Sequence, residues 1–581
     1  MTGKLKAALV LFCLLWSAAA WSAPFRPGEP ILPLKQVKIG MKGYGKSVFQ
    51  GNRIQAFPVE VLGVVKKKER PSELILIRAS GPDIDKAGGL ASGMSGSPIY
   101  LDGKLAGAFS FGWDYGDPKM GLVTPIEHMT KLFDYKDQVP SFPPVADIGA
   151  KDARTPLDEQ FDELYDRYVS GQSVEEPKNV LIADGISRRS MKKLERLLGS
   201  RVFSGGSDDN HVLPGPRQKP APGASVSALL AWGDVALNVC GTLTAADNSG
   251  RFVAFGHSFK NWGAVSYPIA YNTIHGIVNS IESPFKLSSA ANIIGMVTQD
   301  RPEGIAGYFG RYAPAVSVRV EVEDRDSGRK SLRRFQMVND RQAVVQLLPE
   351  LVSGLADMEI GRVSGGSVRY NVVIDGEGMP KNWGLGDVVA AKEDVLGEAM
   401  IPISALVEKV VNNPYQDLGT VGLDISLFVS SSNLKLLIEG LSVDKTHVSA
   451  GDEITATVTL RPWRQTPQVR RFKLRVPLDM SGACSVVVRA GASVPADDAE
   501  QVTDRRLSSF PQFLSELKSA ERACEVVVEL TSQSDGAATA KTEFAGETRR
   551  RRLRSGAMRV FRSDYVVDGN LQVPVFVGPG E

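Results

Sequence analysis

The sequence is poor in the residues that build metal centres and disulfide frameworks. Its 581 residues include four cysteines and five histidines. There is no Cys-x-x-Cys pair, no His-Glu-x-x-His and no acidic calcium loop. Neither charge sign is in excess, because 68 basic residues stand against 66 acidic ones. We therefore expect no metal, no cofactor and no nucleic-acid partner.

Long apolar runs and aromatic residues are also scarce. Beyond residue 23 no stretch of about 18 or more apolar residues occurs, so the sequence predicts no membrane-spanning helix there. Aromatic residues make up 7% of the chain, whereas it holds 57 glycines and 34 prolines. This composition indicates turn-rich β structure, and the length suggests about three to four domains.

The N-terminus has the three regions of a secretory signal peptide. Lys4 and Lys6 supply the positive charge, residues 7–16 are apolar, and residues 17–23 are small. Cleavage after Ala20 or Ser22 fits the preference for small residues. We expect the chain to be exported to a periplasmic or extracellular space.

Three cysteines lie beyond this segment. Cys484 and Cys524 each begin a run ending in three valines. In an oxidising compartment the two either pair as a disulfide or remain buried thiols. We expect Cys240 to be a packed core residue.

The most informative stretch is the sequence Gly-Met-Ser-Gly-Ser-Pro at residues 93–98. Glycines beside Ser95 allow a sharp turn in which the amides of Gly93 and Ser95 point at one developing negative charge. Two apolar strands follow, joined by Asp102-Gly103, a dipeptide typical of two-residue hairpins. The layout is that of the nucleophile loop of chymotrypsin-like serine proteases. The alternative is a glycine-rich turn in an ordinary β domain.

The same layout predicts a substrate slot. In Gly-Ala-Phe-Ser-Phe-Gly, which closes the second strand, residues Ser110, Phe111 and Gly112 would bind the backbone of a peptide.

A serine nucleophile needs a base, usually histidine. Of the five histidines we choose His257, because it follows a strand and Gly256, where its ring can project between two β units. The alternative is a partly buried histidine that ends a strand. For the acid that orients the base we name Asp83 or Asp85, just before the serine loop. Asp234 and Asp247 flank the histidine hairpin and remain open, and each aspartate is also an ordinary turn residue.

Two segments resemble the SpoIVB serine peptidase family. One is the serine segment, with Asp102 to Ala108 after it. The other runs from Cys-Gly-Thr-Leu-Thr at 240–244 to Gly-His at 256–257. The resemblance implies that Ser95 is the nucleophile and His257 the general base. It also implies a chymotrypsin-like pair of β-barrels and an exported protease with a restricted protein substrate. The family has the histidine segment first; here the order is reversed, and its aspartate position falls near Ser80.

Periodicity and turn residues divide the chain. We predict a mainly β fold: a chymotrypsin-like double β-barrel with a helical insertion, then a mixed α/β segment and a C-terminal Ig-like β-sandwich. The expected units are the signal peptide 1–23, the serine barrel 24–135, the helical insertion and linker 136–223, the histidine barrel 224–320, the mixed segment 321–430 and the sandwich 431–581.

The sequence therefore favours an exported serine endopeptidase that acts on a protein or peptide. The rival is an inactive, SpoIVB-like envelope scaffold or binding protein. In either case we expect the C-terminal sandwich to be the surface for an envelope partner.

Overall fold

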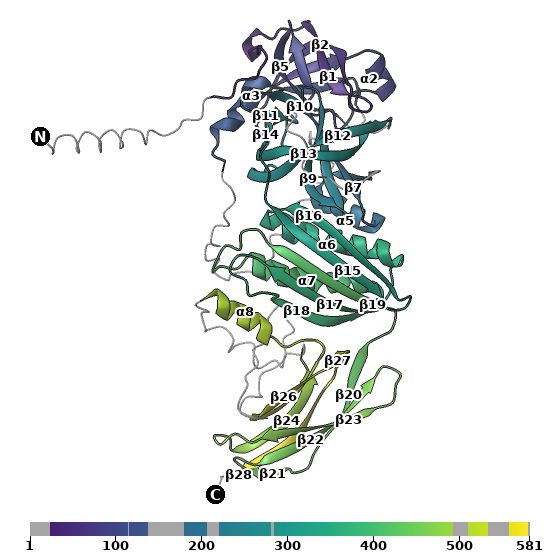
Figure 1. Cartoon of the computed structure of the whole chain (residues 1–581), viewed down its shortest axis with the longest axis vertical. Coiled ribbons are helices and arrows are strands. Elements are labelled where there is room, and N and C mark those ends of the chain that lie inside the picture. The colour runs from purple at the N-terminus through teal and green to yellow at the C-terminus, as the bar shows by residue number, and fades with distance from the viewer. Residues whose placement is uncertain are drawn as a thin grey trace, which may run out of the picture.

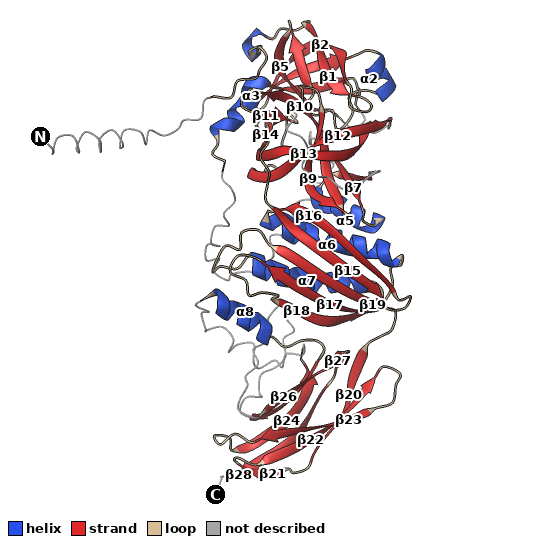
Figure 2. Cartoon of the chain, viewed as in Figure 1, coloured by secondary structure: helices blue, strands red, loops and turns tan. Residues whose placement is uncertain are grey.

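A computed structural model describes residues 24–113, 116–137, 179–205, 220–280, 284–491, 509–532 and 557–578. The expected mainly β fold is confirmed, because strands dominate each part of the chain (Figure 2). The expected signal peptide and most of the expected insertion 136–223 lie outside the described residues. Within the described part, no helix is both long and apolar enough to cross a membrane.

The first unit is a closed barrel with strand order β1-β2-β3-β6-β5-β4. Its core consists of apolar side chains that alternate along the strands, such as Phe57, Val59 and Val61. The strands are β1 (Lys42–Val48), β2 (Ile54–Lys66), β3 (Glu73–Ala79), β4 (Pro98–Leu101), β5 (Lys104–Phe111) and β6 (Met120–Pro125). The short helices are η1 (Leu34–Gln36), α2 (Pro82–Ala87), α3 (Ile126–Thr130) and η2 (Lys131–Asp134).

A second ring of strands lies beside this barrel (Figure 1). Its pairings run β9-β12-β13-β14-β11-β10, and β9 also pairs with β10, which closes the ring. The strands are β9 (Ser225–Gly233), β10 (Ala236–Ala246), β11 (Arg251–Ala254), β12 (Gly263–Val278), β13 (Phe285–Arg301) and β14 (Gly304–Phe309). On the outer side of β10 lie β7 (Val180–Asp184), α5 (Arg188–Leu198) and β8 (Arg201–Ser204).

Helix α5 begins and ends at residues that favour helix ends. The side chain of Ser187 accepts a hydrogen bond from the amide of Ser190 at the helix start, and Gly199 ends the helix in the left-handed conformation.

The mixed α/β segment continues the same sheet. Strand β16 pairs with β9, so that the order runs β18-β17-β19-β15-β16-β9 and on into the ring. Helices α6 and α7 cover one face (Figure 1), and apolar residues of both helices contribute to the core. The elements are β15 (Ala315–Asp324), β16 (Arg329–Val338), α6 (Arg341–Ile360), β17 (Gly366–Asp375), β18 (Gly384–Ala391), α7 (Val395–Val411) and β19 (Gly422–Ser430).

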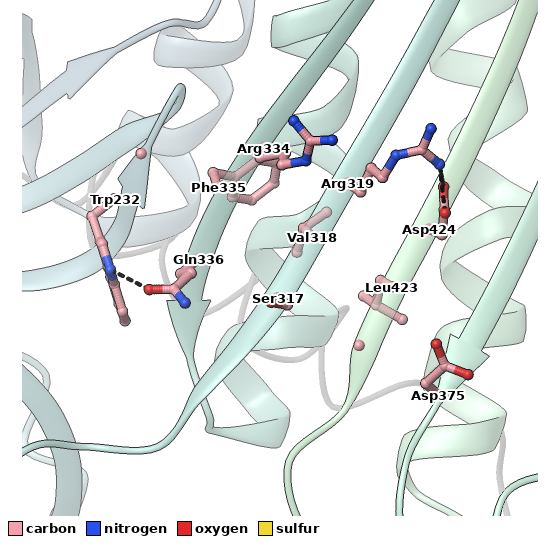
Figure 3. A pocket seen from close by; sticks show the side chains of 12 residues that line it. Trp232, Ser317, Val318, Arg319, Arg334, Phe335, Gln336, Asp375, Leu423 and Asp424 are labelled. Atoms are coloured by element: carbon pink, nitrogen blue, oxygen red, sulfur yellow. Dashed lines mark hydrogen bonds and ion pairs between the residues drawn. The ribbon is translucent and has the colours of Figure 1, made fainter. Parts of the chain in front are cut away.

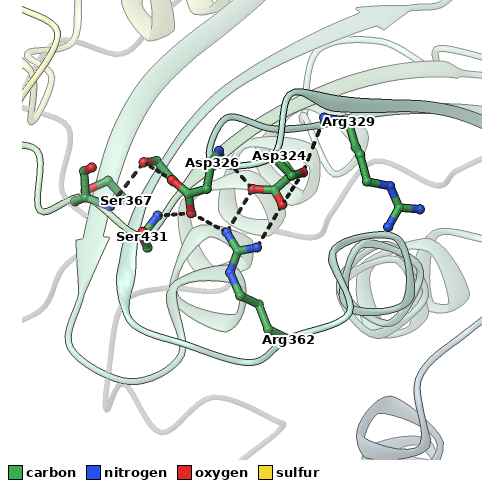
Figure 4. A network of polar contacts seen from close by, with 9 residues as sticks. Asp324, Asp326, Arg329, Arg362, Ser367 and Ser431 are labelled. Carbon is green, nitrogen blue, oxygen red and sulfur yellow. Dashed lines mark hydrogen bonds and ion pairs between the residues drawn. The ribbon is translucent and has the colours of Figure 1, made fainter.

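One end of this sheet is held together by Arg362, which follows α6 (Figure 4). Its guanidinium donates to both carboxylate oxygens of Asp324, at 2.8 and 2.9 Å, and to Asp326 at 2.6 Å. Asp326 accepts from the amide of Ser431 at 2.7 Å. The network joins the β15–β16 turn, the end of α6 and the end of β19, and it lowers the pKa of Asp324 well below its usual range.

The C-terminal unit has two sheets, β23-β22-β20-β27 and β21-β28-β24-β25-β26, that share one apolar core. Its strands are β20 (Lys435–Val443), β21 (His447–Ser449), β22 (Glu453–Pro462), β23 (Gln468–Arg475), β24 (Gly482–Ala490), β25 (Glu525–Ser532), β26 (Met558–Arg562), β27 (Val566–Asp568) and β28 (Asn570–Gly578). Helix α8 (Phe510–Ser519), between β24 and β25, packs Phe510, Leu514 and Leu517 into the core of the preceding units.

The alternatives for the cysteines are resolved. Cys484 and Cys524 are both buried thiols that form no disulfide, and so is Cys240. Burial is the largest cause of a rise in the pKa of the Cys524 thiol to about 11, followed by the nearby carboxylate of Asp387.

Candidate active site

Ser95 lies in the bend between α2 and β4. Gly93 and Gly96 on either side have φ angles of 89° and 95°, in the left-handed region that favours glycine. A Cβ on Gly96 would lie 1.9 Å from the carbonyl oxygen of Thr242. Gly96 is therefore required twice, by the turn and by the close approach of the second ring.

Strand β10 of the second ring holds the serine bend in place through hydrogen bonds. The amide of Thr242 donates to the carbonyl of Ser95 at 2.8 Å, and the Thr242 hydroxyl donates to that of Gly93 at 3.2 Å. The hydroxyl of Thr244 donates to the carbonyl of Gly96 at 2.8 Å. Residues two apart on a strand share a face, so both threonines reach the bend. The Gly-Thr-Leu-Thr pattern was the visible sequence feature that could have located this contact.

The bend has two amides without an acceptor. Within the described residues, the backbone N–H groups of Gly93 and Ser95 donate no hydrogen bond, whereas that of Gly96 donates to Phe109 at 2.7 Å. Buried backbone amides are nearly always paired in folded proteins. Those of Gly93 and Ser95 are the two amides that the sequence predicts to point at one developing negative charge.

Ser110 lies directly against Ser95. The Ser95 hydroxyl, whose residue is 4% exposed, donates to the carbonyl of Ser110 at 3.4 Å. The β5–β6 pairing shifts register between Phe109 and Phe111, so Ser110 is the extra residue of a bulge. Ser110 and Phe111 are buried at the end of β5, and Gly112 follows them at intermediate exposure.

His257 follows β11 and is 1% exposed. Its ring lies near the aromatic rings of Phe111 and Phe255, with centroids 5.7 and 6.4 Å away. Burial lowers the pKa of His257 to about 4, against the opposing effect of a hydrogen bond to the backbone of Ser258. The ring is therefore neutral across the physiological pH range.

The hydrogen bonds of the ring determine its tautomer. Nδ1 of His257 lies 2.7 Å from the carbonyl oxygen of Ser258. A carbonyl only accepts, so a neutral ring carries its proton on Nδ1. Nε2 is buried and has no hydrogen-bond partner among the described residues. It presents an unused lone pair, as a general base requires.

The histidine segment contacts the serine barrel at Gly256. The hydroxyl of Thr124 on β6 donates to the carbonyl of Gly256 at 2.6 Å and lies 3.0 Å from the hydroxyl of Ser110. A Cβ on Gly256 would lie 3.2 Å from Cβ of Ser110. Ser110 therefore borders both Ser95 and the residue before His257, which brings together two segments far apart in the sequence.

The candidate aspartates make other contacts. Asp83 accepts from the side-chain amide of Gln55 at 2.9 Å, and Asp85 forms an ion pair of 2.7 Å with Lys119. Asp234 accepts from the amide of Arg334. Among the described residues no carboxylate forms a hydrogen bond or ion pair with the ring of His257. The Ser258 carbonyl occupies the position at Nδ1 that an acid would take.

A buried lysine lies next to Gly93 of the serine bend, and the sequence did not predict it. Lys286 on β13 is fully buried and donates to the hydroxyl of Ser47 on β1 at 2.9 Å. A Cβ on Gly93 would lie 3.2 Å from its side chain and 3.1 Å from the sulfur of Cys240. Burial lowers the pKa of Lys286 to about 8, against a smaller opposing effect of Cys240. Nothing in the sequence Phe-Lys-Leu-Ser-Ser at 285–289 distinguishes such a lysine from an exposed one.

A groove of about 520 Å³ lies away from these residues, where β9 meets the mixed sheet (Figure 3). Trp232 donates from its ring to Gln336 at 2.7 Å across this seam, and Arg319 pairs with Asp424 on the sheet beyond. Ser95 and His257 do not line it. In the described part of the chain, no group of three or more His, Cys, Asp or Glu residues is placed to hold a metal ion.

Comparison with known proteins gives one match. Residues 29–130 match the family model described as SpoIVB peptidase S55. No curated protein and no solved structure matches the chain. The matched range contains the serine bend and all six strands of the first barrel, and it ends well before His257. The expected resemblance is therefore confirmed for this segment: residues 29–130 are similar to the SpoIVB peptidase family.

Proposed function

We propose that this chain is an exported serine endopeptidase in which Ser95 is the nucleophile and His257 the general base. The observation that carries the proposal is the convergence at Ser110. The Ser95 hydroxyl contacts the carbonyl of Ser110, and Gly256, the residue before His257, lies against the side chain of Ser110. The match of residues 29–130 to a serine peptidase family supports the same reading.

The chemistry follows from the hydrogen bonds. Ser95 Oγ attacks the scissile carbonyl while Nε2 of His257 takes its proton. The oxyanion accepts from the amides of Gly93 and Ser95. His257 then returns the proton to the leaving amine, and water releases the acyl group by the same steps in reverse. The Ser95 hydroxyl donates to the carbonyl of Ser110 at 3.4 Å, so it must turn from this contact to donate to Nε2 of His257. Hydrogen bonds between catalytic groups often form fully only when substrate binds.

This proposal uses a dyad in place of a triad. The Ser258 carbonyl fixes the tautomer of His257 but cannot neutralise an imidazolium as a carboxylate does. We therefore expect a slower enzyme than one with an aspartate at Nδ1, with Asp83 and Asp85 outside the catalytic machinery.

The fold proposed with this function is a chymotrypsin-like pair of barrels with one catalytic residue in each. The closed barrel β1–β6 and the ring β9–β14 support it, because Ser95 belongs to the first and His257 to the second, and hydrogen bonds from Thr124 and Thr242 join the two. Residues Ser110, Phe111 and Gly112 then form the edge along which a peptide lies. We further propose that the paired C-terminal sheets form an Ig-like sandwich that binds an envelope partner.

A specific observation favours the rival, an inactive envelope scaffold with the fold of a protease. Ser95 and His257 are 4% and 1% exposed, and no described carboxylate contacts the ring. A site so covered must open before a substrate can reach it.

A fluorophosphonate probe separates the two proposals, because it reacts only with a serine activated by a base and an oxyanion hole. The mature wild-type protein is compared with Ser95→Ala, His257→Ala and Ser97→Ala. Ser97 is the matched control, since its buried hydroxyl, two residues away, has no hydrogen-bond partner among the described residues. We expect labelling of the wild type and of Ser97→Ala only.

Labelling that survives in Ser95→Ala would refute the assignment of the nucleophile. Folded wild type that is not labelled, even with a small probe, would favour the scaffold.

A further inference from the structure

A buried carboxylate, that of Asp300, contacts the loop that follows His257, at residues 258–262. Asp300 on β13 has no exposed surface. Its two oxygens accept from the amides of Phe259 and Lys260, at 2.6 and 2.8 Å. The amides of Asn261 and Trp262 lower its pKa in the same way, although burial is the larger effect and the net shift is upward. One carboxylate thus faces the successive amides of residues 259–262, directly after His257 and Ser258.

This loop is one that needs support. Phe255 and Asn261, on either side of His257, have φ angles of 68° and 58°. Residues other than glycine rarely occupy this region, and they keep such a conformation only where the surrounding structure fixes it. The Asp300 carboxylate supplies such a constraint, since hydrogen bonds from amides to a charged group are the strong ones.

We propose that Asp300 is the positioning residue for His257: by fixing the backbone of residues 259–262, it holds the Ser258 carbonyl against Nδ1. The inference rests on the proposed function and deepens it, because the chain then uses a carboxylate to orient its base without placing it at the ring. The effect passes through the backbone, from carboxylate to loop and from the Ser258 carbonyl to the imidazole.

The test measures the tautomer of His257 directly. Long-range proton–nitrogen NMR spectra of the histidine rings report which nitrogen carries the proton, and His257→Gln identifies the signals. The variants are Asp300→Ala and the nearly isosteric Asp300→Asn, which keeps the volume if the alanine variant folds poorly. Asp247→Ala is the matched control. Asp247 is also a buried carboxylate in the β9–β14 ring of strands. It accepts from the amides of Ser249 and Arg251 in the turn between β10 and β11, at the other end of that hairpin from His257.

We expect a fixed Nδ1–H tautomer in the wild type and in Asp247→Ala, and mixed tautomers in both Asp300 variants. Fluorophosphonate labelling should fall by roughly tenfold or more in the Asp300 variants, because a small misplacement of a catalytic group costs up to about 100-fold. Labelling of Asp247→Ala should stay near the wild-type rate.

The two readouts separate the two proposals. A fixed tautomer in both folded Asp300 variants would overturn the positioning role, whatever the probe shows. An equal loss of order in Asp247→Ala would also overturn it, since the effect would then be general. Mixed tautomers in the Asp300 variants, together with an unlabelled wild type, would support the positioning of the ring and refute the peptidase.

Discussion

The hydroxyl of Thr124 and the carbonyl of Gly256 form a 2.6 Å hydrogen bond between the serine barrel and the residue before His257. Thr124 is fully buried. The bond therefore joins the two rings of strands in a place that water does not reach, one residue from the proposed base.

Replacing Thr124 with valine keeps the shape and leaves the Gly256 carbonyl without this donor. An unpaired buried acceptor costs about 1–3 kcal/mol, so the free energy of unfolding should fall by that amount in denaturant titrations. Labelling by the fluorophosphonate should fall as well, because His257 is no longer held in its position relative to Ser95. Thr124→Ser, which keeps the hydroxyl, is the control; equal losses in both variants would show that packing of the methyl group matters instead.

The low pKa of His257 predicts activity in acid. The base works only when neutral, and its folded pKa is about 4 in place of the ordinary 6.5. Labelling should therefore stay near its maximum as the pH falls through 6.5, with half the rate near pH 4. A rate that halves near pH 6.5 would contradict the burial of the ring.

The same shift predicts how stability depends on pH. As the pH falls from 6.5 towards 4, the unfolded chain binds a proton at this residue and the folded chain does not. The contribution of His257 to stability is therefore lost through this window. Denaturant titrations of His257→Gln should show a weaker pH dependence there than those of the wild type.

The low pKa of Lys286 predicts how the stability of the protein changes at alkaline pH. Its folded pKa of about 8 lies below the ordinary 10.5, so the folded state releases its proton first and stability rises with pH between these values. The total rise is on the order of 3 kcal/mol. Titrations of Lys286→Met should lack this rise, whereas the exposed Lys104→Met should keep it. A rise that persists in Lys286→Met would place its origin elsewhere.

Two glycines with similar backbone angles should respond differently to alanine. Gly96 and Gly103 have φ angles of 95° and 70°, but a Cβ on Gly103 meets no atom within 4 Å. Gly103→Ala should cost about 1–2 kcal/mol from backbone strain alone. Gly96→Ala also forces the bend away from Thr242, and we expect a loss of more than about 3 kcal/mol together with all labelling. Thermal unfolding of the two variants measures the difference.

Local patterns predicted much of the fold. Asp102-Gly103 forms the expected left-handed turn, with φ angles of 48° and 70°. Helices α6 and α7, in the segment expected to be mixed α/β, each begin after an aspartate, Asp340 or Asp394, whose side chain accepts from the amide three residues on. Capping residues, turn glycines and apolar periodicity act within a few residues, so they can be read from one sequence.

Long-range pairing could not be predicted in this way. Nothing local indicates that β16 pairs with β9, or that α8 packs on the core of the units before it. The carbonyl at Nδ1 of His257 was missed for a similar reason, because every residue has one and only the path of the loop selects Ser258. The aspartates predicted from the sequence do not include Asp300, whose carboxylate accepts from two amides of the loop although it lies on another strand.

Strand β9, which the second ring and the mixed sheet share, limits where the chain can be shortened. Its residues 226–228 pair with β12, and residues 231–233 pair with β16 of the mixed sheet. A fragment that stops before β16 would leave the second half of β9 as a bare edge. Such edges pair readily with other chains and promote aggregation. The ring β9–β14 and the mixed sheet are therefore joined through β9, and a shortened protein should keep both of them together with α8, which packs on their core.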